Sequence, residues 1–232
     1  MSGAQIGLLA FGAWQTLLLT LGGAALGLLF GFLGGLARVS DVKILRAIGF
    51  VYVEFFRGAA VLVLAFWFVY ALPMLGWQLE PLFAGMLALG LNIGAYAAEV
   101  VRGAIQSVPS SQYEAALALN FTTGQRMRRV VVPQAVVAMI PPFSNNIIEL
   151  LKASAVVAVV SISELTFNGQ LIWSGNGRAA SVFGGLLIMY GIMAVVFTIL
   201  MRLLERRAAL SVGRQPDPGM WKRMRRRAEV SA

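Results

Sequence analysis

Long apolar stretches, separated by short polar segments, dominate this 232-residue chain. A helix needs about 20 consecutive apolar residues to cross the roughly 30 Å hydrocarbon layer of a bilayer. Five stretches are long enough, and they cover about residues 14–37, 48–75, 82–101, 135–160 and 181–203. Within lipid a backbone must satisfy its own hydrogen bonds, which a helix does. The pattern therefore predicts an all-α integral membrane protein with five transmembrane helices.

Composition supports a membrane protein and excludes most enzyme classes. Hydrophobic residues make up 59% of the chain and charged residues 12%, whereas charged residues near a quarter are usual in soluble domains. The chain contains no Cys and no His, and its ten acidic residues are scattered, so no metal site or nucleophile–base pair is indicated. No lysine follows the glycine that a phosphate-binding P-loop requires. We predict that this chain is not an enzyme and binds no cofactor, and that another chain carries any ATP and Mg²⁺.

The basic residues predict the orientation of the chain, because cytoplasmic loops are enriched in Lys and Arg. They gather on one side of the expected membrane: Arg38, Lys43, Arg46, Arg102, Arg126, Arg128, Arg129, Arg202, Arg206, Arg207, Arg214 and the run from Lys222 to Arg227. The N-terminus and the loop near Trp77 have none, and the expected loop 161–180 has only Arg178. We therefore place the N-terminus outside and the C-terminus in the cytoplasm. The expected organisation is a permease domain over 1–205 and a basic cytoplasmic tail over 206–232.

The net charge of +9 agrees with this orientation. Basic clusters beside a membrane attract anionic lipid, so we expect the bilayer surface as the partner and no nucleic acid. The N-terminus lacks both a basic n-region and a clear cleavage site, so the first span is expected to be retained.

The segment QYEAALALNFTTGQRMRRVVVPQA, residues 112–135, is polar and regularly spaced. Ser111 with Glu114, and Thr122 with Gln125, have the spacing of capping boxes, so two short helices are predicted to begin at about 112 and 123. Asn120 lies between them and tolerates the left-handed conformation that ends a helix. Pro133 is expected to end the second helix or to mark its junction with the fourth span.

This cytoplasmic helix pair has an apolar stripe and a basic half. The stripe consists of Tyr113, Ala116, Leu117 and Phe121. Two interpretations are open on composition alone. The pair is either a surface that docks on a cytoplasmic partner or an ordinary connecting loop with a solvated charged face.

The same segment resembles the signature loop of membrane subunits of bacterial ABC importers. That pattern is Glu-Ala-Ala, three residues, Gly, nine residues, Ile, one residue, Leu-Pro. Here Glu114, Ala115, Ala116 and Pro133 match, and Asn120 stands at the glycine position. The runs EFFRGAAVLVLAFWFVYALP, AYAAEVVRGAIQSVP, PQAVVAMIPPFSNNIIELLK and SISELTFNGQ resemble the branch for polar amino-acid uptake, of the histidine, glutamine and arginine type. The resemblance extends over about residues 12–205.

The resemblance implies a type I ABC importer permease fold in the bacterial cytoplasmic (inner) membrane. It implies two ATPase subunits, a second permease subunit of the same or a similar chain, and an extracytoplasmic solute-binding protein as partners. The signature loop would be the coupling element that fits a groove on the ATPase, with Glu114 as both cap and contact. The solute would be an amino acid or a related small zwitterion. An ectoine or hydroxyectoine importer is an alternative, because the SISELTF run resembles that subgroup.

Polar residues inside the spans are candidates for the translocation path, because an unpaired charge is costly at mid-depth. Glu54 with Arg57, Glu99 with Arg102, and Glu149 with Lys152 each lie three residues apart on one helix face. Glu99 and Arg102 are expected to form a local pair. The remaining candidates for the path are Glu54, Arg57, Asn92, Asn145, Asn146, Glu149 and Lys152. Pro141 and Pro142 are expected to interrupt the helix before the amides, as in transporters with broken helices.

Gly23, Gly27, Gly31 and Gly35 recur every four residues in the first span and predict a close helix–helix contact. The partner is either another helix of this chain, which we favour, or a second permease subunit. Two further functional classes are weighed against an importer subunit. A stand-alone carrier or channel would more often show an internal repeat, and a membrane scaffold or enzyme is disfavoured by the absence of a catalytic constellation.

Overall fold

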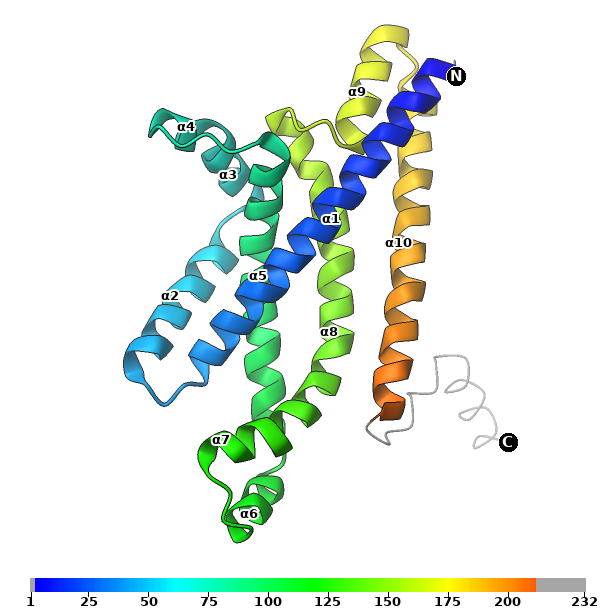
Figure 1. Cartoon of the computed structure of the whole chain (residues 1–232). Helices are drawn as coiled ribbons and strands as arrows, with labels where there is room; N and C mark the ends of the chain where they lie inside the picture. The colour runs from blue at the N-terminus through cyan, green and yellow to red at the C-terminus, as the bar shows by residue number, and fades with distance from the viewer. Residues whose placement is uncertain (1–2, 212–232) are drawn as a thin grey trace, which may run out of the picture.

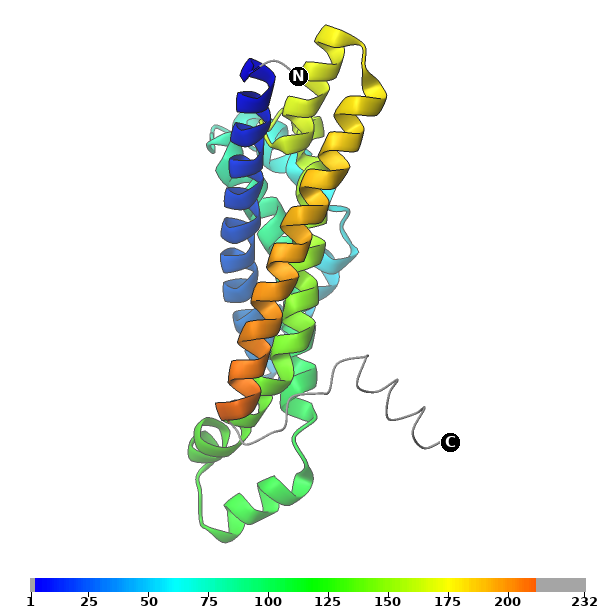
Figure 2. The same ribbon diagram turned by 90° about the vertical axis from the view of Figure 1, so that its right-hand side faces the viewer.

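The computed structural model describes residues 3–211, and every regular element in this range is a helix. The basic cluster from Lys222 to Arg227, and Arg214, lie outside the described residues. The long helices α1 (Gly3–Arg38), α5 (Pro81–Gln106), α8 (Val132–Ala153) and α10 (Ala179–Ser211) run along the bundle. The start of α1 and the end of α10 lie at opposite ends of it (Figure 1), and Figure 2 shows α1 and α10 extending over the same length. The all-α prediction is confirmed for the described part of the chain.

Four continuous helices are long and apolar enough to span a bilayer, and they are Gly3–Arg38, Pro81–Gln106, Thr123–Val160 and Ala179–Arg207. They include or overlap the first, third, fourth and fifth spans predicted from the sequence. The third of these joins α7 (Thr123–Arg126), a π-helical turn η2 (Met127–Val131), α8 and the 3₁₀ helix η3 (Ser154–Val160) without a gap. Pro133 therefore marks a junction inside a continuous helix, at the start of α8.

The predicted second span, 48–75, is wrong as a single straight helix. It consists of α2 (Lys43–Gly58) and a second arm made of α3 (Val61–Phe66), the π-helical turn η1 (Trp67–Ala71) and α4 (Leu72–Met74). The two arms meet at an angle of 100°. Ala59 and Ala60 adopt extended backbone conformations, with ψ of 135° and 129°, and this turns the chain. The structure therefore has four continuous candidate spans, or five if the bent pair counts as one.

Two further expectations about the backbone are wrong. Pro141 and Pro142 do not interrupt α8, which remains helical through both of them. Neighbouring helices pack along α8, and such packing allows prolines to persist inside membrane helices. The segment 161–180, expected to be a loop, contains α9 (Leu165–Asn176), which ends at Gly177 in the left-handed conformation, with φ of 67°.

The glycine stripe of α1 packs against α5 of the same chain, as we favoured. A Cβ atom added to Gly27 would lie 2.5 Å from Ile93 Cγ2, and one added to Gly31 would lie 2.5 Å from Ala97 Cβ. Larger side chains would hold the two backbones apart, so the small residues permit this contact. The helices α2, α8 and α9 pack on the α1–α5 pair, and α10 packs on α8 and α9.

Candidate functional site

A short helix pair, α6 (Ser110–Ala118) and α7, lies at one end of the bundle, the end at which α10 finishes (Figure 1). The Thr122–Gln125 capping box is confirmed, because Gln125 N donates to Thr122 Oγ1 at 3.3 Å and Thr122 N donates to Gln125 Oε1 at 3.0 Å. The turn at Asn120 is confirmed by its φ of 53°. Together the cap and the turn fix where α6 ends and where α7 begins.

The predicted Ser111–Glu114 capping box is wrong. The helix begins about two residues earlier than predicted, at Ser110, and its N-cap is Pro109, which makes no side-chain cap. Proline has a fixed φ, here −57°, and this places the start of α6 without help from Glu114. The Glu114 side chain is therefore not used within its own helix and is exposed.

The interior of the helix pair is packed by aromatic and basic side chains. The guanidinium of Arg126 lies 5.5 Å from the ring centroid of Tyr113, and that of Arg129 lies 5.8 Å from the ring of Phe121. Contacts of this kind are attractive, by about 0.5–1 kcal/mol at exposed sites. Ala116 is buried in the same interior, with 2% exposure. Tyr113 and Phe121 are partly buried. Of the apolar stripe, Ala116 is therefore buried, Tyr113 and Phe121 are partly buried, and Leu117 is exposed.

The outward surface of the pair is instead formed by Leu117 and Leu119, which are 56% and 67% exposed, beside the exposed Glu114 and Ala115. On α7 and η2, an open hollow is lined by Gly124, Gln125, Arg128 and Arg129. Two large exposed leucines on an otherwise polar protrusion form the kind of surface that a partner protein covers.

A second polar surface lies on α8. Lys152 Nζ donates to Glu149 Oε1 at 3.3 Å, and both side chains are about two-thirds exposed (63% and 68%). Asn145 is one turn earlier on the helix and is also exposed. Residues 145, 149 and 152 fall on one helix face because they are spaced by four and three positions. We call these three residues the α8 polar face.

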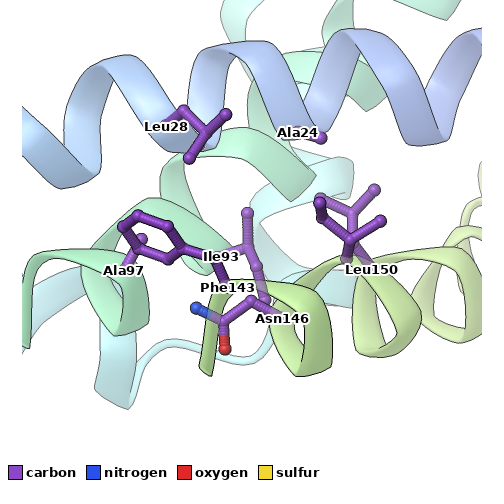
Figure 3. A pocket seen from close by; sticks show the side chains of 9 residues that line it. Ala24, Leu28, Ile93, Ala97, Phe143, Asn146 and Leu150 are labelled. Carbon is purple, nitrogen blue, oxygen red and sulfur yellow. The ribbon is translucent and has the colours of Figure 1, made fainter. Parts of the chain in front are cut away.

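Asn146 is separated from that face. It contributes to a cavity of about 20 Å³ among side chains of α1, α5 and α8, including Leu28, Ile93 and Phe143 (Figure 3). Its Nδ2 atom is buried and has no hydrogen-bond partner among the described residues. The structure therefore does not bring Asn146 together with Asn145 and Glu149.

Five charged residues form a chain of ion pairs that links α1, α2 and α5. In order, they are Arg57, Glu54, Arg38, Glu99 and Arg102, with nitrogen–oxygen distances of 3.5, 3.7, 3.3 and 2.7 Å. The predicted pairing of Glu99 with Arg102 is confirmed. Arg38, which the sequence suggested only as a marker of orientation, connects the two acidic residues. Glu54 and Arg57 therefore have ion-pair partners on α1 and α2.

Asn92 forms hydrogen bonds at the bend between α2 and α3. Its Nδ2 donates to Phe56 O at 2.8 Å and to Ala59 O at 3.2 Å, and Tyr96 Oη donates to Arg57 O at 3.4 Å. These carbonyl groups lie where α2 ends and lack helical partners. Satisfying them stabilises the bend inside a low-dielectric environment. The Asn92 amide nitrogen is thus hydrogen-bonded to backbone carbonyl groups.

Sequence reasoning missed a buried cluster around Glu164, which caps α9. Its Oε1 accepts a hydrogen bond from Phe167 N at 2.9 Å, and its Oε2 accepts one from Tyr190 Oη at 2.6 Å and one from Thr16 Oγ1 at 3.3 Å. Glu164 is 0% exposed, and burial raises the pKa of its carboxyl group despite these hydrogen bonds. The cluster joins α1, α9 and α10. An acidic residue followed by a 12-residue polar and apolar run ending at Gly177 was the available sequence signal for the helix it caps.

Known proteins resemble this chain over most of its length. The sequence profile of the family described as "Binding-protein-dependent transport system inner membrane component" matches residues 23–210. A probable amino-acid ABC transporter permease protein, y4tF, of Sinorhizobium fredii is 41% identical over 206 residues, covering 86% of this chain and 87% of that protein. The glutamine transport system permease protein GlnP of Escherichia coli is 35% identical over 204 residues, covering 87% and 93%.

Solved structures agree with the sequence comparison. A crystal structure described as an amino acid ABC transporter with histidines superimposes with a TM-score of 0.81 at 33% identity, covering 87% of this chain and 94% of that one. The MetNI methionine ABC transporter in an inward-facing conformation gives a TM-score of 0.77 at 23% identity, which supports the fold alone.

Proposed function

This chain belongs to the family of binding-protein-dependent transport system inner membrane components, and from that premise we propose how its geometry serves transport. It is the permease subunit of an amino-acid ABC importer, and a separate chain hydrolyses ATP. The names of y4tF and GlnP refer to the transport of amino acids, and this disfavours the ectoine alternative. The remaining assignments concern which surfaces of the chain perform which step.

The α6–α7 pair is proposed to couple the permease to its ATPase. The single observation that carries this assignment is the exposure of Leu117 and Leu119 on a pair whose own interior is packed. An apolar ridge on a stiff support fits the recognition of a helix by a groove. Glu114 and Ala115 flank the ridge. Asn120 and Pro133 set its geometry, and Ala116 supports it from within. Two ATPase subunits, which would hold ATP and Mg²⁺, are the proposed partners at this end.

The translocation path is proposed to run along the α8 polar face. The face lies on a helix long and apolar enough to span the bilayer, and within residues 3–211 Glu149 and Lys152 form an ion pair only with each other. Charges inside a span usually face a partner or a water-filled cavity because lipid solvates them poorly. A second permease subunit would enclose such a cavity opposite this face. The solute would arrive from an extracytoplasmic binding protein at the end of the bundle where α9 lies.

The orientation proposed from the sequence, with the N-terminus outside, is consistent with the basic residues of the described part. Arg126, Arg128 and Arg129 lie near α6, and Arg206 and Arg207 lie on the last part of α10. Both segments are found at the same end of the bundle (Figure 1). Cytoplasmic enrichment of Arg then places this end inside the cell and the helix α9 outside.

The proposed function is tested by uptake into liposomes. The permease, its ATPase and its solute-binding protein would be reconstituted together, with radiolabelled glutamine as the first probe and a panel of amino acids after it. Uptake is expected only when ATP, the ATPase and the binding protein are all present. Uptake by the permease alone would instead support the alternative of a stand-alone carrier or channel. An ATPase variant that binds but does not hydrolyse ATP is the matched control.

A further inference from the structure

The α8 polar face has a balanced charge. From Val132 to Ala153, Glu149 and Lys152 are the only charged residues, so their charges sum to zero. Asn145, one turn away, is polar and uncharged. The pair is also not locked in place, because both side chains are about two-thirds exposed and touch each other at 3.3 Å.

The position of this pair along its apolar helix disfavours exposure to lipid. The continuous helix ends at Val160, and helical rise places Lys152 and Glu149 roughly 15–20 Å before that end. This is about half of the roughly 30 Å hydrocarbon layer. Charges at mid-depth need water, a counter-ion or a polar ligand. The helices α1, α5 and α10 pack on other parts of α8, which leaves the polar face open to a polar environment.

From these observations we infer that the α8 polar face selects amino acids with uncharged side chains. The Glu149 carboxylate receives the α-ammonium group of the solute, and Lys152 donates to its α-carboxylate. The Glu149–Lys152 contact is exchanged for these two, so both protein charges stay paired. This inference rests on the proposed function, since it assigns the solute class of the same path.

The solute side chain would meet Asn145, roughly 6 Å along the helix from Glu149. An amide donates and accepts hydrogen bonds, so it suits a neutral polar side chain such as that of glutamine. An extra positive or negative charge on the solute would find no counter-ion on this face. An unpaired charge in a low-dielectric site is disfavoured strongly, and this is the physical source of the selectivity.

Direct binding separates this selectivity from that of the binding protein. The complex of permease and ATPase in detergent would be titrated with radiolabelled glutamine, arginine and glutamate in a scintillation proximity assay. The wild-type complex is expected to bind glutamine at least about tenfold more tightly than the other two. Loss of one charge-assisted hydrogen bond corresponds to about tenfold in affinity or more.

Two variants and two controls complete the test. Lys152→Gln leaves one negative charge on the face and should shift preference toward arginine by about tenfold, whereas Glu149→Gln should shift it toward glutamate. Lys43→Gln and Asp41→Asn change the net charge of the chain equally, at exposed positions outside the path, and should leave preference unchanged.

Three results would overturn the inference. The first is a wild-type complex that does not prefer glutamine or binds none of the three solutes. The second is that both variants weaken the binding of all three solutes equally. The third is that both variants leave the three affinities unchanged. Failure of the proposed function looks different: the wild-type system then shows no ATP-dependent uptake of any amino acid in liposomes, whatever the detergent complex binds.

Discussion

Replacing Gly31 with alanine tests the close contact between α1 and α5, on which α2 and α8 pack. The added Cβ would lie 2.5 Å from Ala97 Cβ and 3.3 Å from the Ala97 carbonyl carbon. Carbon atoms pack best at about 3.5–4.0 Å. The two helices must therefore separate by roughly 1 Å. That separation also weakens the contacts of Gly27 and Gly35 with α5.

The expected magnitude combines two opposing effects. Overpacking a tight contact costs about 1–3 kcal/mol, while replacing glycine by alanine within a helix stabilises it by about 1 kcal/mol. Gly191→Ala is the matched control, because a Cβ there meets no atom within 4 Å and only the stabilising effect remains. The two variants should differ by the overpacking cost, which for a chain of this size corresponds to roughly 2–12 °C in melting temperature.

Thermal unfolding of the purified protein in detergent, followed by tryptophan fluorescence, measures this difference. The double variant Gly31→Ala with Ala97→Gly should recover most of the loss, since it removes the methyl group that the new one meets. Equal melting temperatures for Gly31→Ala and Gly191→Ala, or no recovery in the double variant, would refute the described packing of α1 on α5.

Three further predictions follow from other parts of the chain. Asn120→Val should destabilise the α6–α7 turn by about 1–2 kcal/mol, because a β-branched residue is strained at positive φ; Asn120→Gly should not, and limited proteolysis of the turn would report the difference. Burial raises the pKa of Glu164 in the folded state. The resulting contribution to stability is therefore complete below the ordinary pKa of glutamate and is lost as the pH rises through the raised pKa of the folded state. Melting temperatures measured against pH should show this fall in wild type and a flatter profile in Glu164→Gln. Since the chain has no cysteine, Trp77→Cys should react with an impermeant maleimide from outside intact cells and Gln112→Cys only after lysis; the opposite pattern would reverse the proposed orientation.

Local patterns in the sequence predicted those features that depend on neighbouring residues. The four continuous spans follow from the length of apolar runs. The Thr122–Gln125 box and the turn at Asn120 follow from residue types spaced within one helical turn. The pairing of Glu149 with Lys152 follows from a spacing of three residues.

Features that depend on distant partners were not predictable in this way. Hydropathy is continuous across Gly58, and the bend there is stabilised by Asn92, which lies more than thirty residues further along the chain. Thr16 reaches Glu164 across 148 positions. Ala116 faces inward because α7 packs against α6. The periodicity of α6 alone does not specify which face of α6 this contact covers. Pro141 and Pro142 fail to break α8 because other helices support it.

The central claim is that the exposed ridge formed by Leu117 and Leu119 binds the ATPase, and Leu117→Asp tests it most directly. Leu117 is 56% exposed in the isolated chain, so its burial on docking would contribute about 1–1.5 kcal/mol, and a carboxylate in its place would be buried without a partner. The measurement is co-purification of the ATPase with the permease, followed by solute-stimulated ATP hydrolysis in liposomes containing the binding protein. We predict loss of both for Leu117→Asp, wild-type behaviour for Leu117→Met, and equal insertion of both variants in the membrane. Wild-type co-purification and stimulation for Leu117→Asp would contradict the assignment of α6–α7 as the coupling element.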